Sequence, residues 1–206
     1  MYSALRNPRS IFAILAALFI VLTPFAQPKT AVAKATTSQF TASGTLCLVG
    51  LPTIKANLNK KGILHVNARG EQLAGEIAES SWSEITGAGV EAVITHEESM
   101  FNLVTNTFEG KIEGKIKIAI PGEVMQGSFQ GTVGGAFLPI TDPSALLTSI
   151  YTSTANVKWN MRNKGSDSDD EDKSRARGTA SVTFMVDPLA GTYCGPIVMT
   201  GTYREK

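Results

Sequence analysis

Cysteine and histidine are scarce in this chain, and their scarcity limits the chemistry that it can carry. Two cysteines and two histidines among 206 residues cannot form a multi-disulfide scaffold, a four-cysteine zinc site or a histidine-rich metal cluster. Basic residues are not in excess either, because 19 Lys and Arg stand against 18 Asp and Glu. Such a balance lacks the positive surface that is typical of nucleic-acid-binding proteins. We therefore expect neither a nucleic-acid partner nor a cofactor.

The sequence also lacks the common catalytic motifs. It contains no G-x-S-x-G nucleophile motif, and the run that begins at His96 is not H-E-x-x-H because position 100 is Met. We expect His65 and His96 to be surface side chains without a catalytic role. The absence of a catalytic constellation favours a non-enzymatic protein. The enzymatic alternative is a small hydrolase or isomerase whose carboxylates and tyrosines converge only in space.

The N-terminal segment has the pattern of a secretory signal peptide. Arg6 and Arg9 precede an apolar run over residues 11–22, and small residues stand two apart near Ala33 and Ala35. The run of about 12 residues is shorter than the roughly 20 that a membrane-spanning helix needs, although an uncleaved anchor is the alternative. We expect cleavage after Ala33 or Ala35 and export to the periplasm or the cell exterior.

Removal of residues 1–35 changes the charge of the chain. This segment holds four basic residues and no acidic one, so residues 36–206 carry a formal net charge of −3. A mildly acidic protein has no general attraction for nucleic acid or for an anionic membrane. We expect no stable membrane span after cleavage.

Cysteine placement agrees with export. Cys47 and Cys194 both lie in the part that remains after cleavage, and two cysteines in an oxidising compartment are expected to form a disulfide. Two buried free thiols are the alternative. Neither cysteine belongs to a C-x-x-C pair, so a redox catalyst is not indicated.

Alternating apolar and polar residues predict antiparallel strands over most of residues 36–206. In the strongest hairpin, alternation over residues 111–120 and 125–133 flanks a turn at Pro121-Gly122-Glu123. Further alternation covers residues 54–69, 151–162 and 179–186, and weaker strands are expected at 41–49, 90–95 and 100–108. We expect about ten strands in a single all-β domain, with residues 72–85 forming either a helix or a strand plus loop.

The predicted sheet has two possible arrangements, an antiparallel β-barrel and a two-layer β-sandwich. Glycines such as Gly114 and Gly127 lie on the apolar faces of two strands, where they permit the bending that closure requires. A disulfide between Cys47 and Cys194 also requires the first and last strands to be adjacent, which closure provides. Both features favour the barrel, and the sandwich remains the alternative.

An acidic run at residues 165–175 is predicted to form a solvated loop between two strands. Asp167, Asp169 and Asp172 are weak candidates for calcium ligands. The run lacks the turn glycine and the closing Glu of an EF-hand loop, since position 172 is Asp and position 178 is Gly. The sequence therefore predicts no metal site of a known type.

Aromatic residues beside small ones on the apolar faces are the candidates for a ligand pocket. They are Phe129, Trp159, Tyr151 and Phe184. The same pattern fits an interdigitated core, which is the commoner outcome for such residues. We expect an exported binding module for an apolar small molecule or a protein partner. The alternative is a structural or interaction protein of the cell envelope.

Overall fold

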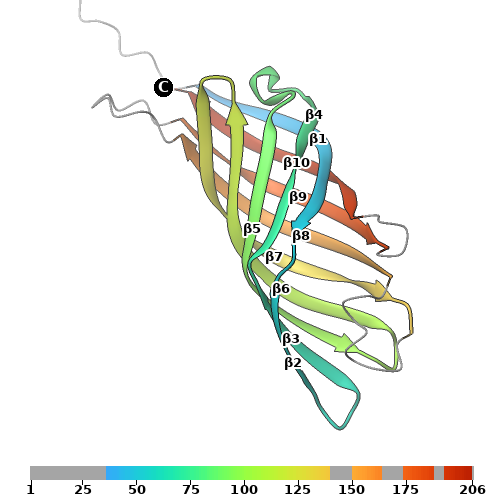
Figure 1. Cartoon of the computed structure of the whole chain (residues 1–206). Coiled ribbons are helices and arrows are strands. Elements are labelled where there is room, and N and C mark those ends of the chain that lie inside the picture. Colours follow the sequence, from blue (N-terminus) through green and yellow to red (C-terminus); the bar gives the residue numbers. More distant parts are fainter. Residues whose placement is uncertain (1–35, 140–149, 164–173, 188–192, 206) are drawn as a thin grey trace, which may run out of the picture. The chain divides into compact units, whose positions relative to one another are not determined.

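The computed structural model describes residues 36–139, 150–163, 174–187 and 193–205. These residues form ten strands and one short 3₁₀ helix (Figure 1). The strands are β1 (Thr36–Gly50), β2 (Thr53–Leu58), β3 (Ile63–Arg69), β4 (Glu71–Ser80), β5 (Gly89–Asn102), β6 (Thr107–Ile120), β7 (Glu123–Phe137), β8 (Tyr151–Asn163), β9 (Arg175–Val186) and β10 (Cys194–Glu205), and the helix η1 is Ser83–Ile85. The predicted signal peptide and the candidate calcium ligands Asp167, Asp169 and Asp172 lie outside the described residues.

All ten strands belong to one antiparallel sheet whose pairing closes on itself. The order β5-β4-β1-β10-β9-β8-β7-β6 returns to its start because β6 also pairs with β5 along its whole length. β3 pairs with the part of β5 that extends past β4, and β2 pairs with β3. The prediction of an all-β fold is confirmed, and the strands form a hydrogen-bonded ring within one sheet.

The strongest predicted hairpin is confirmed, one of the two alternatives for residues 72–85 is observed, and one predicted strand is wrong. β6 and β7 pair through a turn in which Gly122 has a φ of 78°, a conformation that glycine adopts without strain. Residues 72–85 form a strand plus loop, ending in η1. The strand expected at residues 100–108 is wrong, because residues 103–106 form the turn between β5 and β6.

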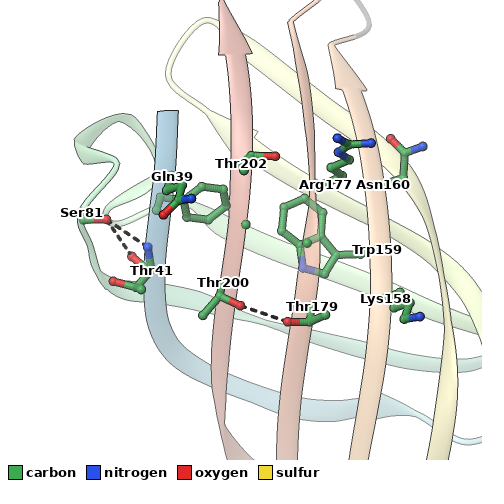
Figure 2. A pocket seen from close by; sticks show the side chains of 13 residues that line it. Gln39, Thr41, Ser81, Lys158, Trp159, Asn160, Arg177, Thr179, Thr200 and Thr202 are labelled. Carbon is green, nitrogen blue, oxygen red and sulfur yellow. Dashed lines mark hydrogen bonds between the residues drawn. The ribbon is translucent and has the colours of Figure 1, made fainter. Parts of the chain in front are cut away.

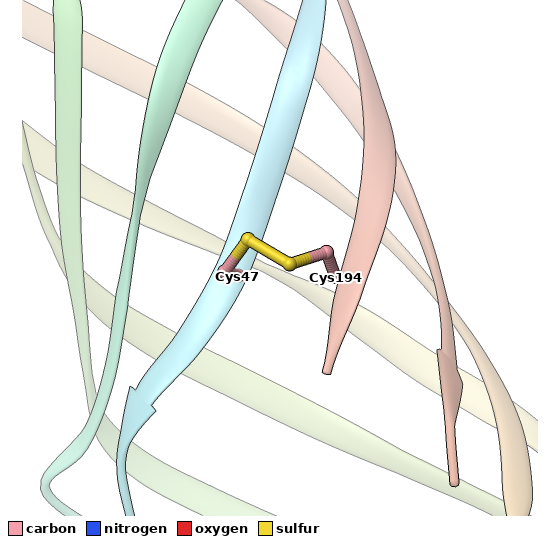
Figure 3. Close-up of a disulfide and its surroundings, with 2 residues drawn as sticks. All are labelled: Cys47 and Cys194. Carbon is pink, nitrogen blue, oxygen red and sulfur yellow. A yellow bond between two sulfur atoms is a disulfide. The ribbon is translucent and has the colours of Figure 1, made fainter. Parts of the chain in front are cut away.

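The predicted disulfide is present and joins the first and last strands of the ring. Cys47 and Cys194 lie directly opposite each other in the pairing of β1 with β10 (Figure 3). Leu46 and Ile197 are buried, whereas Cys194 and Val198 are exposed. Because strand side chains alternate between faces, the disulfide lies on the outer face of the sheet.

One end of the ring is packed solid. Its largest fully buried side chains are Ile77, Ile85, Ile118, Met125, Met161, Met199 and Val90. The segment between β4 and β5 covers this end, and Figure 1 shows it at the opposite end from the β2–β3 hairpin. Within that segment Trp82 stacks on Tyr203, with ring centroids 4.2 Å apart. The packing closes this end to solvent.

Inner-face glycines make room for aromatic rings. A Cβ atom added at Gly178 or Gly201 would lie 2.8 Å from the indole of Trp159, and one at Gly114 would overlap the ring of Phe129. The sequence analysis assigned Gly114 to sheet bending. In the structure its missing side chain also lets a large ring lie flat against the neighbouring strand, and this layer of rings separates the packed end from the space beyond it.

Candidate functional site: an apolar cavity with two inward-facing carboxyl groups

Beyond the layer of aromatic rings, the interior of the ring is hollow. A cavity of about 380 Å³ lies there, within the range of roughly 300–1,000 Å³ that is usual for small-molecule sites. Inner-face side chains from all ten strands line it, and most of them are aliphatic or aromatic. None of the largest fully buried side chains of the packed end reaches it. The interior is therefore divided into a packed half and an open half.

All four residues that the sequence analysis selected for a pocket line this cavity. They are Phe129, Trp159, Tyr151 and Phe184. Tyr151 and Trp159 stand at opposite ends of the lined part of β8, about 26 Å apart along the strand at 3.3 Å per residue. The cavity is thus deep, with Trp159 at its floor. Their role in binding a ligand remains a prediction.

The tryptophan at the floor of the cavity carries an unused hydrogen-bond donor. Trp159 is 3% exposed, and its indole N–H has no hydrogen-bond partner among the described groups. Figure 2 shows the indole nitrogen on the ring edge that faces Thr179, and the next residue, Ala180, lines the cavity. The nitrogen itself is buried, so this donor is not part of the cavity surface.

The other end of the cavity reaches the surface. Leu51 lines the cavity and is 81% exposed. Aromatic rings surround this mouth: Phe101 stacks on Phe108 with centroids 4.6 Å apart, and Phe108 meets Tyr151 edge-on at 6.4 Å. Beside this mouth the disulfide joins β1 to β10, next to the cavity-lining Leu48 and Tyr193.

Two glutamates are the only charged residues among the described residues that line the cavity. They are Glu71 on β4 and Glu97 on β5. Ile94 and Glu97 both line the cavity although they are three residues apart, because a β-bulge falls between Ile94 and His96. A bulge adds one residue to a strand and so redirects the side chains that follow it.

Glu71 begins the adjacent strand and faces inward in regular alternation with the buried Leu73 and Ile77. Ala68 and Glu71 both line the cavity, again three residues apart, with Gly70 between them at a φ of 82°. The Gly70 N–H donates to the Ile94 carbonyl oxygen at 2.8 Å, which ties the break between β3 and β4 to the bulge in β5. The bulge brings the carboxyl group of Glu97 to the inner face, where that of Glu71 already lies in phase with Leu73.

Buried hydroxyl groups accompany the carboxyl groups. Ser99, which is 2% exposed, donates a hydrogen bond to Glu97 at 2.5 Å. A Cβ atom at Gly110, on the paired strand, would overlap the Ser99 hydroxyl oxygen, so the glycine leaves the space that this hydroxyl needs. Tyr151 and the buried Ser153 line the cavity on β8.

Burial changes the protonation of these groups. Loss of hydration raises the pKa of Glu71 to about 7, and the neighbouring charge of Glu97 adds to the effect. Burial also raises the pKa of Glu97, against the opposing influence of the Ser99 hydrogen bond. The pKa of Tyr151 is raised by burial and then by Glu71 and Glu97. Near neutral pH the tyrosine is therefore un-ionised, and Glu71 is divided between its protonated and ionised forms.

No cation balances the two carboxyl groups within the described part of the chain. The Lys117–Glu91 ion pair at 3.1 Å and the His96–Glu98 contact at 3.3 Å involve neither Glu71 nor Glu97. No Lys, Arg or His is among the described residues that line the cavity. His65 is exposed, and His96 contacts Glu98 outside the cavity.

Neither glutamate is among the site residues predicted from the sequence. Simple alternation from Val90, Ala92 and Ile94 places position 97 on the outer face of the sheet. The available signal was the change of phase, because Ser99 and Phe101 continue the inner face only if one residue is inserted near Thr95. Glu71 directly precedes residues 72–85, whose structure the sequence left ambiguous.

A second depression lies on the outer face, over β1, β8, β9 and β10 (Figure 2). Polar side chains line most of it, among them Lys158, Arg177 and the hydrogen-bonded pair Thr179–Thr200, whose hydroxyl oxygens are 3.0 Å apart. This depression is open to solvent, and it offers a ligand less contact than the interior cavity does.

The described residues contain no group of three or more His, Cys, Asp or Glu side chains that could hold a metal ion. No helix among them has the length and apolar character needed to cross a membrane. Comparison of the chain with known protein families, with curated proteins and with solved structures finds no match. The site must therefore be interpreted from its own chemistry.

Proposed function

We propose that this protein is an exported binding protein whose closed ring of strands is a β-barrel that holds an apolar small molecule. The observation that carries the proposal is the cavity of about 380 Å³ that Phe129, Val157 and Phe184 help to line. Sheets that close around a packed core leave few voids larger than a water molecule. An open, apolar-lined interior above a packed floor is the arrangement expected of a ligand site.

Export is part of the proposal and rests on two features. The Cys47–Cys194 disulfide supports an oxidising compartment, since such bonds are rare in reducing ones. The residues before position 36 have the composition of a cleaved signal peptide. The cell-envelope structural role remains an alternative prediction.

The enzymatic alternative has one specific observation in its favour. Glu71, Glu97 and Tyr151 supply carboxyl and phenol groups inside an apolar cavity, and a raised carboxyl pKa suits acid–base chemistry near neutral pH. Binding and turnover are separated by recovering a bound ligand after incubation. An unaltered ligand supports the binding protein, whereas a product that Glu71→Gln no longer forms supports the hydrolase or isomerase.

Filling the cavity tests the proposed function. Ala155 on β8 is buried and lines the cavity, whereas Ala119 is exposed on the outer face of β6. We expect Ala155→Phe to weaken binding of the uncharged apolar dye N-phenyl-1-naphthylamine by at least about tenfold, because the added ring occupies the ligand space. The matched control Ala119→Phe should bind the dye as the wild type does.

Ala180→Phe provides a second filling variant from another strand, and circular dichroism establishes that each variant is folded. Dye fluorescence that is absent with the wild type, or unchanged in both filling variants, would contradict a ligand site in the interior.

A further inference from the structure

We propose that the cavity selects apolar molecules that carry a single cationic amine, with Glu71 and Glu97 as the paired binding groups for that amine. The inference rests on the proposed function and names the ligand class of the same site. It stands on the placement of two carboxyl groups, without a basic partner among the described residues, in an otherwise apolar space.

The placement of the Glu97 carboxyl group depends on a local backbone feature. Regular alternation would leave position 97 outside, and the bulge after Ile94 brings it inside. Glu71, on the adjacent strand, faces inward in regular alternation with Leu73 and Ile77. Bulges are common next to functional sites, where they redirect a side chain. The bulge therefore places Glu97 on the same face as Glu71, and the hydrogen bond from the Gly70 N–H to the Ile94 carbonyl oxygen ties the start of β4 to the bulge.

The absence of a basic side chain beside the two carboxyl groups indicates the charge of the ligand. Buried carboxylates in folded proteins are usually paired with a cation or a metal, since an unpaired buried charge is costly. The titratable side chains that line the cavity are Glu71, Glu97, Tyr151 and Tyr193, and β6, β7 and β9 contribute none among the described residues. The Ser99 hydroxyl supplies Glu97 with one donor. An ammonium group of the ligand would supply the opposite charge.

The rest of the cavity determines the remainder of the ligand. The walls between the carboxyl groups and Trp159 are formed by aliphatic side chains such as Ile112, Val182 and Ile197. They fit an alkyl or aromatic body and offer no pairing for a second charge. A fatty acid would bring a like charge toward Glu71 and Glu97, and an alcohol would leave both carboxyl groups without a cation.

Competition between matched ligands tests this inference. Decylamine, decanol and decanoic acid differ only in the head group, and each displaces N-phenyl-1-naphthylamine if it enters the cavity. At pH 8 the amine is still cationic, because its pKa is about 10.4 as in lysine. We expect decylamine to bind at least about tenfold more tightly than decanol, and decanoic acid to bind more weakly than either.

Variants locate the source of the preference. Glu71→Gln and Glu97→Gln should each reduce the preference for amine over alcohol by about tenfold and leave decanol binding unchanged. Glu109→Gln removes an exposed carboxyl group of β6 and should leave both affinities unchanged. Lowering the pH to 5 should reduce the preference in the wild type, since protonation neutralises Glu71.

Proton release provides an independent measurement. Binding of the cation favours the ionised carboxyl groups, so calorimetry at pH 7 in two buffers of different ionisation enthalpy should show protons released with decylamine and none with decanol. If dye and decanol bind but the amine has no advantage and releases no proton, the inference fails and the proposed function stands. If no ligand binds, the proposed function itself fails.

Discussion

Replacing both Cys47 and Cys194 with serine should lower the free energy of unfolding by about 5 kcal/mol, the value expected for a disulfide that closes a loop of this length. The two cysteines are separated by 147 positions in the sequence, so the bond restricts nearly the whole described chain when it unfolds. Its effect in the folded state is small, because β1 and β10 already pair along their length. The loss should therefore arise mainly from greater freedom of the unfolded chain.

Urea unfolding measures this effect directly. The double serine variant and the wild type treated with a reductant should show the same reduced midpoint, since Cys194 is exposed and accessible to the reductant. A loss of less than about 1 kcal/mol would contradict the account. We also expect weaker dye binding by the variant, because the disulfide holds the strand ends beside the cavity-lining Leu48 and Tyr193.

Glu71→Gln should remove a pH dependence of stability worth about 3 kcal/mol, the free-energy equivalent of the pKa difference at this residue. The pKa of Glu71 is about 7 in the folded protein and 4.5 for an ordinary glutamate. The folded state therefore binds more protons than the unfolded state between these values. Its stability falls as the pH rises from about 4.5 to about 7 and is level above that, as far as this residue is concerned.

The measured quantity is the difference in the free energy of unfolding between the wild type and Glu71→Gln as a function of pH. That difference isolates Glu71 from other titrating groups, and its slope does not depend on how well the cavity accommodates the amide that replaces the carboxyl group. Glu109→Gln, on the exposed side of β6, should follow the wild-type curve. A wild-type curve parallel to that of Glu71→Gln between pH 4.5 and 7 would show that Glu71 is not desolvated in the folded state.

The ionisation of Glu71 connects the stability of the protein with ligand binding. An ionised carboxyl group in an apolar cavity opposes folding, and a ligand that supplies a cation removes that opposition. Any ligand that binds only the folded state also raises stability in proportion to the logarithm of its concentration relative to the dissociation constant. Decylamine should therefore stabilise the protein more at pH 8 than at pH 5, where Glu71 is protonated without a ligand.

Much of the fold could be predicted from local patterns. Alternation over β6 and β7, together with the turn at Pro121 and Gly122, indicated the strongest hairpin, and the structure has it. The two cysteines indicated that the first and last strands are adjacent, which the pairing of β1 with β10 confirms. Such features depend on neighbouring residues or on one covalent bond, and sequence reports both well.

The carboxyl groups of the site could not be predicted with the same rules. Strict alternation places Glu97 on the surface, and only the bulge near Thr95 reverses that placement. Whether Phe129 and Trp159 pack together or line a space depends on the distance across the ring, which no local pattern contains. The sequence favoured a packed interior, and that arrangement holds at one end only.

Quenching of Trp159 fluorescence tests the central claim, that an apolar ligand occupies the interior, most directly. Trp82→Phe leaves Trp159 as the single tryptophan of the chain, at the cavity floor. A long-chain bromoalkanol should quench its emission in a saturable manner, because bromine quenches on contact, and adding Ala155→Phe should abolish the quenching. Emission that the bromoalkanol leaves unchanged, or quenching that is equal in the filled variant, would contradict a ligand site inside the ring.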